Sequence, residues 1–405
     1  MSDEAAPLSA DAITVIILAG GIGSRLREVT ATPKTIVPVD GKPFLVHLLD
    51  ALKSKGLRHV IVGTGHGAGE VEDAVSRGNP RLDVAFSRET TPLGTAGALR
   101  LAAGKAKTSH VLAMNGDSWC DFELEKLLSF QRSHPSRPTL IATRVPNADR
   151  FGQLELDPDG RILAFREKGA QSTAGWINGG LYLLPTSVLR DLPDRAPLSL
   201  ERDVMPGWIE GGFHAFRSEA PFLDIGTPES FARKEAFVRS MIESRKAHAR
   251  LTMFSFPTPP ADAPIKTGVG VLLVNDSGEI LLEKRADCGL WGLIGGTIDS
   301  GESVSDTARR EIREETGLDA VVTGLQGIYS DPGTHYVRYP DRGDVKQLID
   351  IVVHARIVSG APVVSAESEE LRFFRRDQLP PESEIALPAR EPLRDWVSGA
   401  RCVLA

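Results

Sequence analysis

Two stretches of this chain combine residue types and spacings that suit chemistry on phosphate groups. The first contains closely spaced glycines and two permanent cations: Gly20, Gly21, Gly23, Arg25 and Lys34. Glycines let a backbone approach a phosphate chain and aim N–H groups at it, and the cations would neutralise a triphosphate. The spacing fits neither the P-loop pattern nor G-x-G-x-x-G, so neither of those nucleotide sites is supported. Taken alone, the glycines are equally compatible with a turn between a strand and a helix.

The second stretch, residues 296–318, reads GTIDSGESVSDTARREIREETGL. Ser303 and Asp306 form a capping box that predicts the start of a helix, and Gly317 stands where a left-handed C-cap would end it. A buried ridge is predicted at every fourth residue: Val304, Ala308 and Ile312. Three carboxylates share another face: Glu311, Glu314 and Glu315. Hard cations with oxygen ligands would remove their mutual repulsion, and a solvated helix with arginine partners is the alternative.

The first stretch must be positioned by the strands and helices around it, and these alternate along the chain. Short apolar runs predict strands at residues 14–18, 60–62, 110–114 and 139–143. Helical patterns separate them, for example at residues 44–53 and 70–76. This alternation predicts a Rossmann-like α/β domain with a mostly parallel sheet. A further helix is predicted from Thr227, an N-cap before Pro228, to about Arg250.

A change of pattern separates a second domain from the first. The prolines between Pro257 and Pro264 can sustain neither a helix nor a central strand, so this segment reads as a stiff, extended linker. Strand patterns resume at residues 269–274 and 280–283, with a turn between them. We therefore divide the chain into an N-terminal tail (1–12), a first domain (13–250), a Pro-rich linker (251–264) and a second domain (265–405).

Length and composition limit the classes of protein that fit. The 405 residues are 41% hydrophobic and 25% charged, which is typical of a globular protein of two or three domains. No apolar run is long enough for a membrane helix, and the acidic start has no signal-peptide core. Three cysteines without a metal-ligand spacing favour the reducing cytoplasm over a zinc site. The net charge of −7, with no basic stripe, argues against nucleic acid as a partner.

The first stretch is part of a longer pattern. The string LAGGIGSRLREVTATPK, followed by PVDGKPFL, resembles the signature of the sugar-1-phosphate nucleotidylyltransferases. The resemblance continues in order through PLGTAG, NGD, FG, REK, NGG and DIGTP, and it covers about residues 13–240. Within that family the segments RLREV, PLGTAGAL, FREKGA and WINGGLYLL are most similar to the D-glycero-α-D-manno-heptose 1-phosphate guanylyltransferases.

That resemblance implies a reaction in which an oxygen of a sugar 1-phosphate attacks the α-phosphorus of a nucleoside triphosphate and pyrophosphate leaves. Two anions meet, so catalysis consists of positioning and charge neutralisation. The catalytic residues that it implies are Arg25 and Lys34 on the triphosphate, Lys168 on the sugar phosphate, and Asp117 and Asp224 as ligands of Mg²⁺. The substrate contacts that it implies are Gly20, Gly21, Gly23, Ser24, Gly152 and Gly179, with Gly94 and Thr95 against the base and Glu167 and Asn178 on sugar hydroxyls.

Several of these residues also have a purely structural interpretation. Asp117 could form a turn, Asp224 could start a helix and Lys168 could be solvated, but the ordered set of motifs favours the functional interpretation. The chain departs from the family at Ser24, where threonine is common, and at Thr35, where proline is common.

The choice of base rests on one glutamate. Guanine presents N1–H and N2–H₂ donors that a carboxylate can accept together. Glu89, a few residues before the PLGTAG motif, is the residue that we expect to read that edge. A solvated glutamate is an equal alternative.

The second stretch resembles the Nudix box at each fixed position, and the likeness covers about residues 266–385. It implies an α/β/α sandwich in which Glu311, Glu314 and Glu315 bind Mg²⁺ and Arg310 orients them through ion pairs. Glu314 and Glu315 are the expected catalytic residues, in hydrolysis of a nucleoside diphosphate linked to another group. Ile294 replaces the usual proline before the box. The substrate itself is not readable from the box.

The sequence therefore predicts a cytoplasmic bifunctional enzyme. Its expected partners are a nucleoside triphosphate (GTP first), a sugar 1-phosphate (a heptose first) and a nucleoside diphosphate derivative, with no nucleic acid and no membrane. Mg²⁺ is expected in both domains, and a homo-oligomer is left open. The alternatives are a mannose- or glucose-1-phosphate transferase that uses GTP, UTP or dTTP, and a Nudix domain that senses a nucleotide sugar without hydrolysing it.

Overall fold

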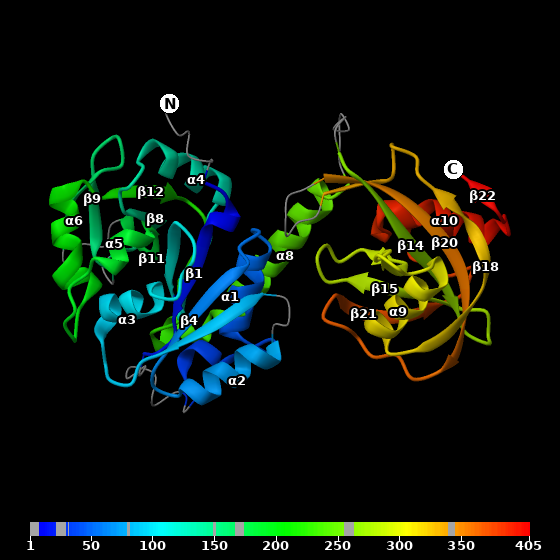
Figure 1. The fold of residues 1–405 in the computed structure, drawn as a ribbon, viewed down its shortest axis with the longest axis horizontal. Helices are drawn as coiled ribbons and strands as arrows, with labels where there is room; N and C mark the ends of the chain where they lie inside the picture. The colour runs from blue at the N-terminus through cyan, green and yellow to red at the C-terminus, as the bar shows by residue number, and fades with distance from the viewer. Residues whose placement is uncertain are drawn as a thin grey trace. The chain divides into compact units, whose positions relative to one another are not determined.

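The computed structural model describes residues 8–21, 30, 32–78, 82–148, 151–166, 174–254, 263–338 and 345–405. Contacts divide the chain into two units, Met1–Ser240 and Met241–Ala405, and each is described by itself (Figure 1). In the part of the chain that the structure describes, no helix is both long and apolar enough to cross a membrane.

The first unit is built on a mixed sheet with a parallel centre. Its strands run in the order β10-β9-β11-β6-β1-β4-β5, and β8 pairs with β11 and β12. The parallel centre consists of β1 (Ile13–Leu18), β4 (His59–Thr64), β5 (Asp83–Arg88) and β6 (His110–Asn115). The others are β8 (Thr139–Val145), β9 (Gln153–Leu156), β10 (Ile162–Arg166), β11 (Gly175–Pro185) and β12 (His214–Ser218). Nearly every residue of β1 is buried, as its unbroken apolar run predicts.

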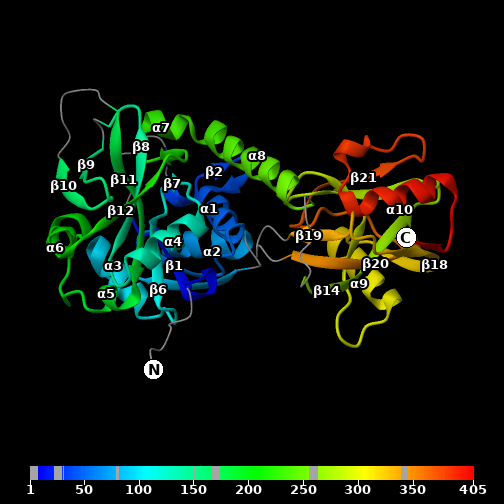
Figure 2. The ribbon, with the colours of Figure 1, turned by 90° about the horizontal axis from the view of Figure 1, so that it is seen from above.

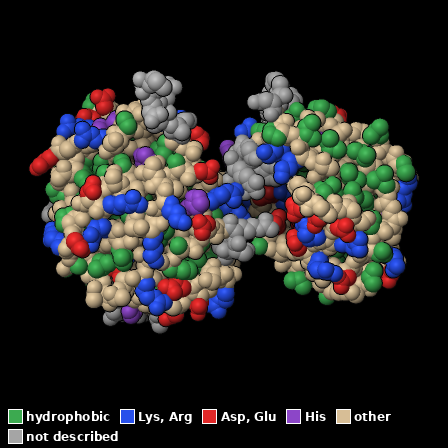
Figure 3. All heavy atoms as spheres, viewed as in Figure 1, with side chains coloured by type: hydrophobic (Ala, Val, Ile, Leu, Met, Phe, Trp, Pro, Cys, Tyr) green, Lys and Arg blue, Asp and Glu red, His purple; other side chains and the backbone are tan. Residues whose placement is uncertain are grey.

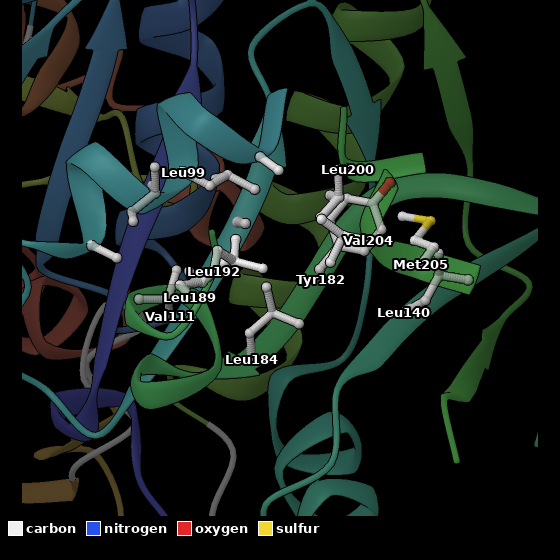
Figure 4. Packing of buried hydrophobic residues seen from close by; sticks show 14 of the residues in the cluster. Leu99, Val111, Leu140, Tyr182, Leu184, Leu189, Leu192, Leu200, Val204 and Met205 are labelled. Carbon is white, nitrogen blue, oxygen red and sulfur yellow. The ribbon is translucent and has the colours of Figure 1, made fainter. Parts of the chain in front are cut away.

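Helices and short elements complete this unit and hold its core. The helices are α1 (Phe44–Lys53), α2 (Ala68–Gly78), α3 (Gly94–Ala103), α4 (Leu124–Ser133), α5 (Thr186–Arg190) and α6 (Met205–Gly211). Two short ribbons pair β2 (Pro38–Val39) with β3 (Lys42–Pro43) and β7 (Ser118–Cys120) with β13 (Phe222–Asp224). In Figure 4, Leu99 of α3 and Leu189 of α5 pack with Val111 and Leu184 of the sheet. The predicted α/β domain with a largely parallel sheet is thereby confirmed.

The helix predicted from Thr227 is interrupted. Thr227 is the N-cap of α7 (Pro228–Ala232), as predicted, and its side chain accepts a hydrogen bond from the Ser230 N–H. The chain then turns at Arg233, the C-cap of α7 with φ and ψ of −93° and −4°, and α8 (Lys234–Thr252) follows. The Lys234 ammonium stacks on the Phe231 ring at this break, 4.1 Å from its centroid.

Residues 241–254, the end of α8 and the turn after it, pack within the second unit. Ala249 and Met253 join a core cluster with Cys288, Leu290 and Ala386. The Arg250 guanidinium donates to the Cys288 carbonyl at 2.6 Å, and Lys246 pairs with Glu369. The sequence pattern places the domain boundary after residue 250, whereas the contacts divide the chain between Ser240 and Met241. Most of the predicted Pro-rich linker, residues 255–262, lies outside the described residues.

The second unit is a mixed sheet between two helices. Its strands run in the order β16-β15-β14-β20-β18-β22, with β17 on β14, β19 on β20 and β21 on β15. They are β14 (Ile265–Val274), β15 (Ile280–Arg285), β16 (Trp291–Gly292), β17 (Ile294–Thr297), β18 (Asp319–Tyr329), β19 (Tyr336–Arg338), β20 (Val345–Ser359), β21 (Ser368–Phe374) and β22 (Val403–Leu404). One face packs against α9 (Val304–Thr316) and the other against α10 (Leu387–Ser398), as Figure 2 shows. The predicted α/β/α sandwich is confirmed.

Candidate functional sites

The candidate site of the first unit lies where the strand order reverses. The chain passes from β1 to β4 on one side of the sheet and later returns to β6 on the other side. Open α/β sheets bind ligands outside the carboxyl ends of their strands at such a switch point. The two strand ends meet here, because the Gly116 N–H donates to the Leu18 carbonyl at 2.9 Å. Gly20 and Gly21 follow β1, and Asp117 follows β6.

Lys34 and Asp117 meet at this edge. The Lys34 ammonium forms an ion pair with the Asp117 carboxylate, and both side chains are partly buried. A methyl group added to Gly21 would lie 3.8 Å from the Lys34 stem, so the glycine loop, the cation and the carboxylate adjoin one another. Eighty-three residues separate this pair along the chain, and only the sheet brings them together.

Asp224 reaches the same edge through the ribbon of β7 and β13. It stands opposite Ser118 in that ribbon, next to Asp117. The Ile225 N–H donates to the Asp117 carbonyl at 3.0 Å, and the Gly226 N–H donates to the Asp224 carboxylate at 2.7 Å. The two aspartates that the sequence proposes as metal ligands therefore lie on neighbouring, hydrogen-bonded segments.

Glu89 is also brought to the glycine loop. It follows β5, and its Oε2 accepts the Leu93 N–H at 3.0 Å. A methyl group on Gly20 would lie 3.2 Å from its Oε1, so this oxygen faces the backbone at the end of β1. The carboxylate thus has one oxygen that shapes the turn before α3 and another directed at the loop.

Gly94 and Thr95, predicted to lie against the base, have structural partners. Gly94 has φ of +76°, and a side chain there would collide with the Leu198 carbonyl at 2.5 Å. The Thr95 hydroxyl accepts the Leu200 N–H at 2.8 Å. These contacts fasten the start of α3 to the segment before α6.

Asn178 and Gly179 lie in an irregular stretch of β11. The Asn178 amide donates to the Tyr182 hydroxyl at 2.7 Å, and its oxygen accepts the Gly180 N–H at 2.9 Å. A side chain on Gly179 would meet the Ile141 carbonyl at 2.7 Å. Gly152 follows Phe151, whose ring packs edge-on against Phe222 at the start of β13. The remaining predicted residues lie outside the described residues: Gly23, Ser24, Arg25, Glu167 and Lys168.

In the second unit, the helix of glutamates is capped as predicted. Ser303 and Asp306 make both hydrogen bonds of the capping box, and Gly317 ends α9 with φ of +70°. Ala308 and Ile312 are fully buried in the core beneath the helix. Acidic and basic side chains gather side by side over α9 in Figure 3.

Arg310 organises the carboxylates of this helix. Its guanidinium donates to Glu302 through two nitrogens, at 2.7 and 2.9 Å, and to Glu311 at 2.7 Å. It also reaches the Thr297 carbonyl at 3.1 Å and Glu314 at 3.4 Å. These hydrogen bonds hold the pKa of Glu302 well below its usual range, at about 2. Arg310 thus pairs with Glu311 and Glu314, two of the three glutamates that it is expected to orient, and most closely with Glu302.

The three predicted metal-binding glutamates differ in burial. The side chain of Glu314 is 61% exposed, that of Glu311 is 12% exposed, and Glu315 as a residue is 7% exposed. Burial raises the pKa of Glu315 to about 9, with the nearby Glu283 carboxylate as the next cause. Glu315 accepts the Gly295 N–H at 3.0 Å. Among the described residues, no three acidic, thiol or imidazole groups converge closely enough to hold a metal ion in the present arrangement.

Glu283 of β15 is a member of this acidic group that sequence reasoning missed. It is buried, accepts the Ser368 hydroxyl at 2.7 Å and has a pKa raised first by burial. Its position outside the box left no local signal, because only the pairing of β15 with β16 and β21 places it beside the helix. Burial raises the pKa of three of these carboxyl groups, those of Glu283, Glu311 and Glu315, and a divalent cation that drew them together would relieve this cost.

Gly296 is required for that arrangement, and its replacement gives a first prediction. A methyl group there would lie 2.1 Å from the Glu311 carboxylate. We expect Gly296→Ala to displace Glu311 and to lower phosphohydrolysis at least tenfold, while Gly324→Ala, where nothing lies within 4 Å, leaves it unchanged. Initial rates across a Mg²⁺ series measure both. Equal rates for the two variants would show that Glu311 can move without loss.

Comparison with known proteins finds a family match for each of the two regions. Residues 14–241 match the nucleotidyl transferase family, and residues 264–396 match the NUDIX domain. The chain belongs to the nucleotidyl transferase family and carries a NUDIX domain after the transferase domain. Both families generally use divalent metals.

Among many relatives of the transferase region, two curated proteins and one solved protein illustrate the likeness. Mannose-1-phosphate guanylyltransferase of Mycobacterium tuberculosis is 34% identical over 229 residues, which are 55% of this chain and 64% of that protein. This chain therefore spans less than two thirds of that relative. D-glycero-alpha-D-manno-heptose 1-phosphate guanylyltransferase of Aneurinibacillus thermoaerophilus is 32% identical over 222 residues, 54% of this chain and 96% of that protein.

The solved protein is HddC from Yersinia pseudotuberculosis. It is 33% identical, covers 55% of this chain and 98% of its own, and superposes with a TM-score of 0.51. Its complex with GMP-PN superposes with a TM-score of 0.50.

Proposed function

We propose that the first unit transfers GMP from GTP to a sugar 1-phosphate, a heptose 1-phosphate first, and releases pyrophosphate. The observation that carries this proposal is the meeting of Lys34, Asp117 and Asp224 beside the glycine loop at the switch point. A cation beside paired carboxylates suits a reaction in which phosphate charge must be neutralised. The relative of which this chain covers 96% acts, by its name, on the heptose phosphate.

Each residue has a task in this proposal. Asp117 and Asp224 would hold Mg²⁺, which when bound screens the triphosphate charge. Lys34 leaves Asp117 for the triphosphate as the substrate enters, because a polyanion competes with a single carboxylate for the ammonium. Glu89 accepts the N1–H and N2–H₂ groups of guanine with the oxygen that faces Gly20. Arg25 and Lys168 supply the remaining cations.

We also propose that the second unit hydrolyses a nucleoside diphosphate derivative. Water attacks one phosphorus, the P–O bond of the diphosphate breaks, and two phosphate monoesters leave. Glu283, Glu311, Glu314 and Glu315 would hold Mg²⁺, which when bound lowers the pKa of that water. Arg310 keeps Glu302 and Glu311 in place.

Two alternatives are tested together with these proposals: another sugar for the first unit, and a second unit that binds without hydrolysing. The mycobacterial relative is named for mannose 1-phosphate, so the sugar can be a hexose. A Nudix unit that binds a nucleotide sugar without hydrolysing it would leave the product of the first unit intact.

The test uses the full chain with Glu314→Gln, so that hydrolysis does not remove the product. Five nucleoside triphosphates, hexose and heptose 1-phosphates and Mg²⁺ are supplied, and products are identified by mass. GDP-heptose is the expected product; a different nucleotide sugar keeps the chemistry and corrects the substrate, and no product from any pair refutes the transferase. Wild-type protein that consumes the same nucleotide sugar excludes a passive sensor.

The base preference gives a second prediction. Glu89→Gln keeps an acceptor for the Leu93 N–H but replaces a charged acceptor of the guanine edge. We expect the preference for GTP over ATP to fall about 10- to 100-fold, the worth of hydrogen bonds to a charged group. Glu72→Gln, which alters a carboxylate paired with Arg88 on the nearby surface, is the control. An unchanged preference in Glu89→Gln would remove this residue from base recognition.

A further inference from the structure

A cavity opens in the second unit on the side of the sheet that α10 covers. Its volume is about 160 Å³, and most of its wall is apolar or glycine. Phe254, Leu293, Leu348 and Pro388 supply apolar surface, while Gly295 and Gly296 form the wall next to the glutamate helix. Gly295 donates to Glu315, and Gly296 lies against Glu311. A molecule seated in the cavity thus lies one strand away from the acidic group.

Asp350 of β20 presents a carboxylate to this cavity. Gly268 stands beside it on β14, and a methyl group there would lie 2.6 Å from its Oδ1. The side chain of Asp350 is 19% exposed, and among the described residues we find no donor bound to it. The nearest imidazole nitrogen, Nε2 of His335, is 3.9 Å away, and burial lowers the pKa of that histidine. Glycine at 268 therefore keeps open the approach to a carboxylate to which no described side chain donates a hydrogen bond.

Asp350 is only partly buried, so water can still reach its carboxylate. Partial burial disfavours the charged form, and a bound donor that replaces this water would be favoured. Burial alone raises the pKa of Asp350 to about 6, so the group is still largely ionised at neutral pH. The cations of the cavity wall are Lys266 and Arg285, and the Arg285 guanidinium is already bound to Asp287 at 2.6 Å. Neither of these two described cations pairs with Asp350, so its carboxylate is available to donors of a bound molecule.

The shape and polarity of the cavity indicate which class of molecule would bind in it. A flat base fits between apolar walls and glycine backbone, and a carboxylate binds two adjacent N–H donors best. Guanine offers N1–H beside N2–H₂. Adenine places an acceptor beside its amino group, and uracil flanks its single N–H with two carbonyls, so each of them would turn a lone pair toward Asp350.

We propose that Asp350 binds the guanine base of a GDP-linked substrate in this cavity. The proposal rests on the proposed hydrolysis of a nucleoside diphosphate derivative, whose diphosphate would then lie beside Glu311 and Glu315. Both units would share guanine nucleotides, so the product of the first unit is a substrate for the second. Met253 and Phe254 line the cavity from the segment after α8, so residues outside the Nudix box contribute to specificity.

The first test measures kcat/KM for hydrolysis of GDP-mannose, ADP-glucose and UDP-glucose by the full chain without pyrophosphate. We expect wild-type protein to prefer GDP-mannose and Asp350→Asn to lose about 10- to 100-fold on it, with less than threefold change on UDP-glucose. Asp276→Asn is the matched control, because its side chain is 92% exposed in a surface turn. An equal loss on all three substrates, or no loss, overturns the assignment.

The second test separates this inference from the hydrolysis on which it rests. Calorimetric titration with GDP is expected to find two sites per wild-type chain, one in each unit, and one site in Asp350→Asn. If wild-type protein hydrolyses no substrate and Asp350→Asn still loses one GDP site, the proposed hydrolysis is refuted and the proposed guanine site is supported. Two undiminished GDP sites in a folded Asp350→Asn protein refute the base site. Thermal unfolding verifies the fold, and we expect Asp350→Asn to unfold no earlier than wild type.

Discussion

Asp117→Asn is expected to lower formation of the nucleotide sugar about a thousandfold, the upper range for loss of one preorganised electrostatic group. The substitution keeps the side-chain shape but removes the charge that faces Lys34 and lies beside the Asp224 segment. Without it, the two aspartates cannot supply two negative ligands to a divalent ion. The chemical step should therefore fail even where the nucleotide still binds.

GTP binding distinguishes this explanation from a simple loss of fold. Lys34 is held by Asp117 in the structure, so the asparagine variant releases the ammonium. We expect the Kd for GTP, measured without metal, to stay the same or to fall, while kcat drops. Asp121→Asn is the control, because that carboxylate pairs with Lys55 at 2.8 Å, only four residues along the chain. Nucleotide-sugar formation by Asp117→Asn within tenfold of wild type would exclude Asp117 as a metal ligand.

Glu315→Gln is expected to abolish hydrolysis by the second unit and to stabilise the metal-free fold. Hydrolysis should fall by a factor of about a hundred to a thousand, because a buried ligand for the metal is lost. The metal-free fold should become more stable, because Glu315 is buried next to Glu283 and the pKa of Glu315 is raised to about 9. Glutamine keeps an acceptor for the Gly295 N–H.

The sign of the pH dependence follows from that raised pKa. A carboxyl whose folded pKa lies above its unfolded value favours the folded state only when protonated, so wild-type stability is lost as pH rises from about 4.5 through about 9. At pH 7 the metal-free variant should exceed wild type by about 3 kcal/mol at most. The difference should vanish near pH 4.

Chemical denaturation with and without Mg²⁺ measures both effects. Mg²⁺ should raise the unfolding midpoint of the second unit in wild type and leave the midpoint of that unit nearly unchanged in Glu315→Gln. Glu370→Gln, whose carboxylate pairs with Arg372 on the surface, should behave as wild type. A variant that is less stable than wild type at pH 7 would show that Glu315 is not a buried, destabilising charge.

Local patterns of sequence predicted the elements that carry the sites. The capping box at Ser303 and the glycine at 317 predicted the bounds of α9, because caps depend on hydrogen bonds within one turn. The apolar runs predicted β1, β4 and β6 of the first unit, because burial on two faces leaves a continuous apolar pattern. They did not predict β5, in which buried and exposed residues are mixed. The ordered motifs predicted both families, which the comparisons confirm.

The helix after Thr227 shows a feature that local sequence patterns do not predict. Its N-cap was predictable, but its interruption at Arg233 was not, because no glycine or proline marks that residue. The grouping of residues 241–254 with the second unit was equally invisible. It depends on contacts of Arg250 and Met253 with segments far along the chain.

The sequence by itself determined the residue types available for phosphate chemistry, the helix that bears the glutamates and the family of each region. Only the tertiary structure decided which of those residues meet. Strand pairing joins Lys34 to Asp117 and adds Glu283 to the acidic group. It also places Asp350 in a largely apolar cavity, where none of the described side chains donates a hydrogen bond to it. The same packing occupies the Thr95 hydroxyl, which accepts a hydrogen bond from the backbone N–H of Leu200. Caps and periodicity act within a few residues, whereas burial and charge pairing are properties of neighbours in space.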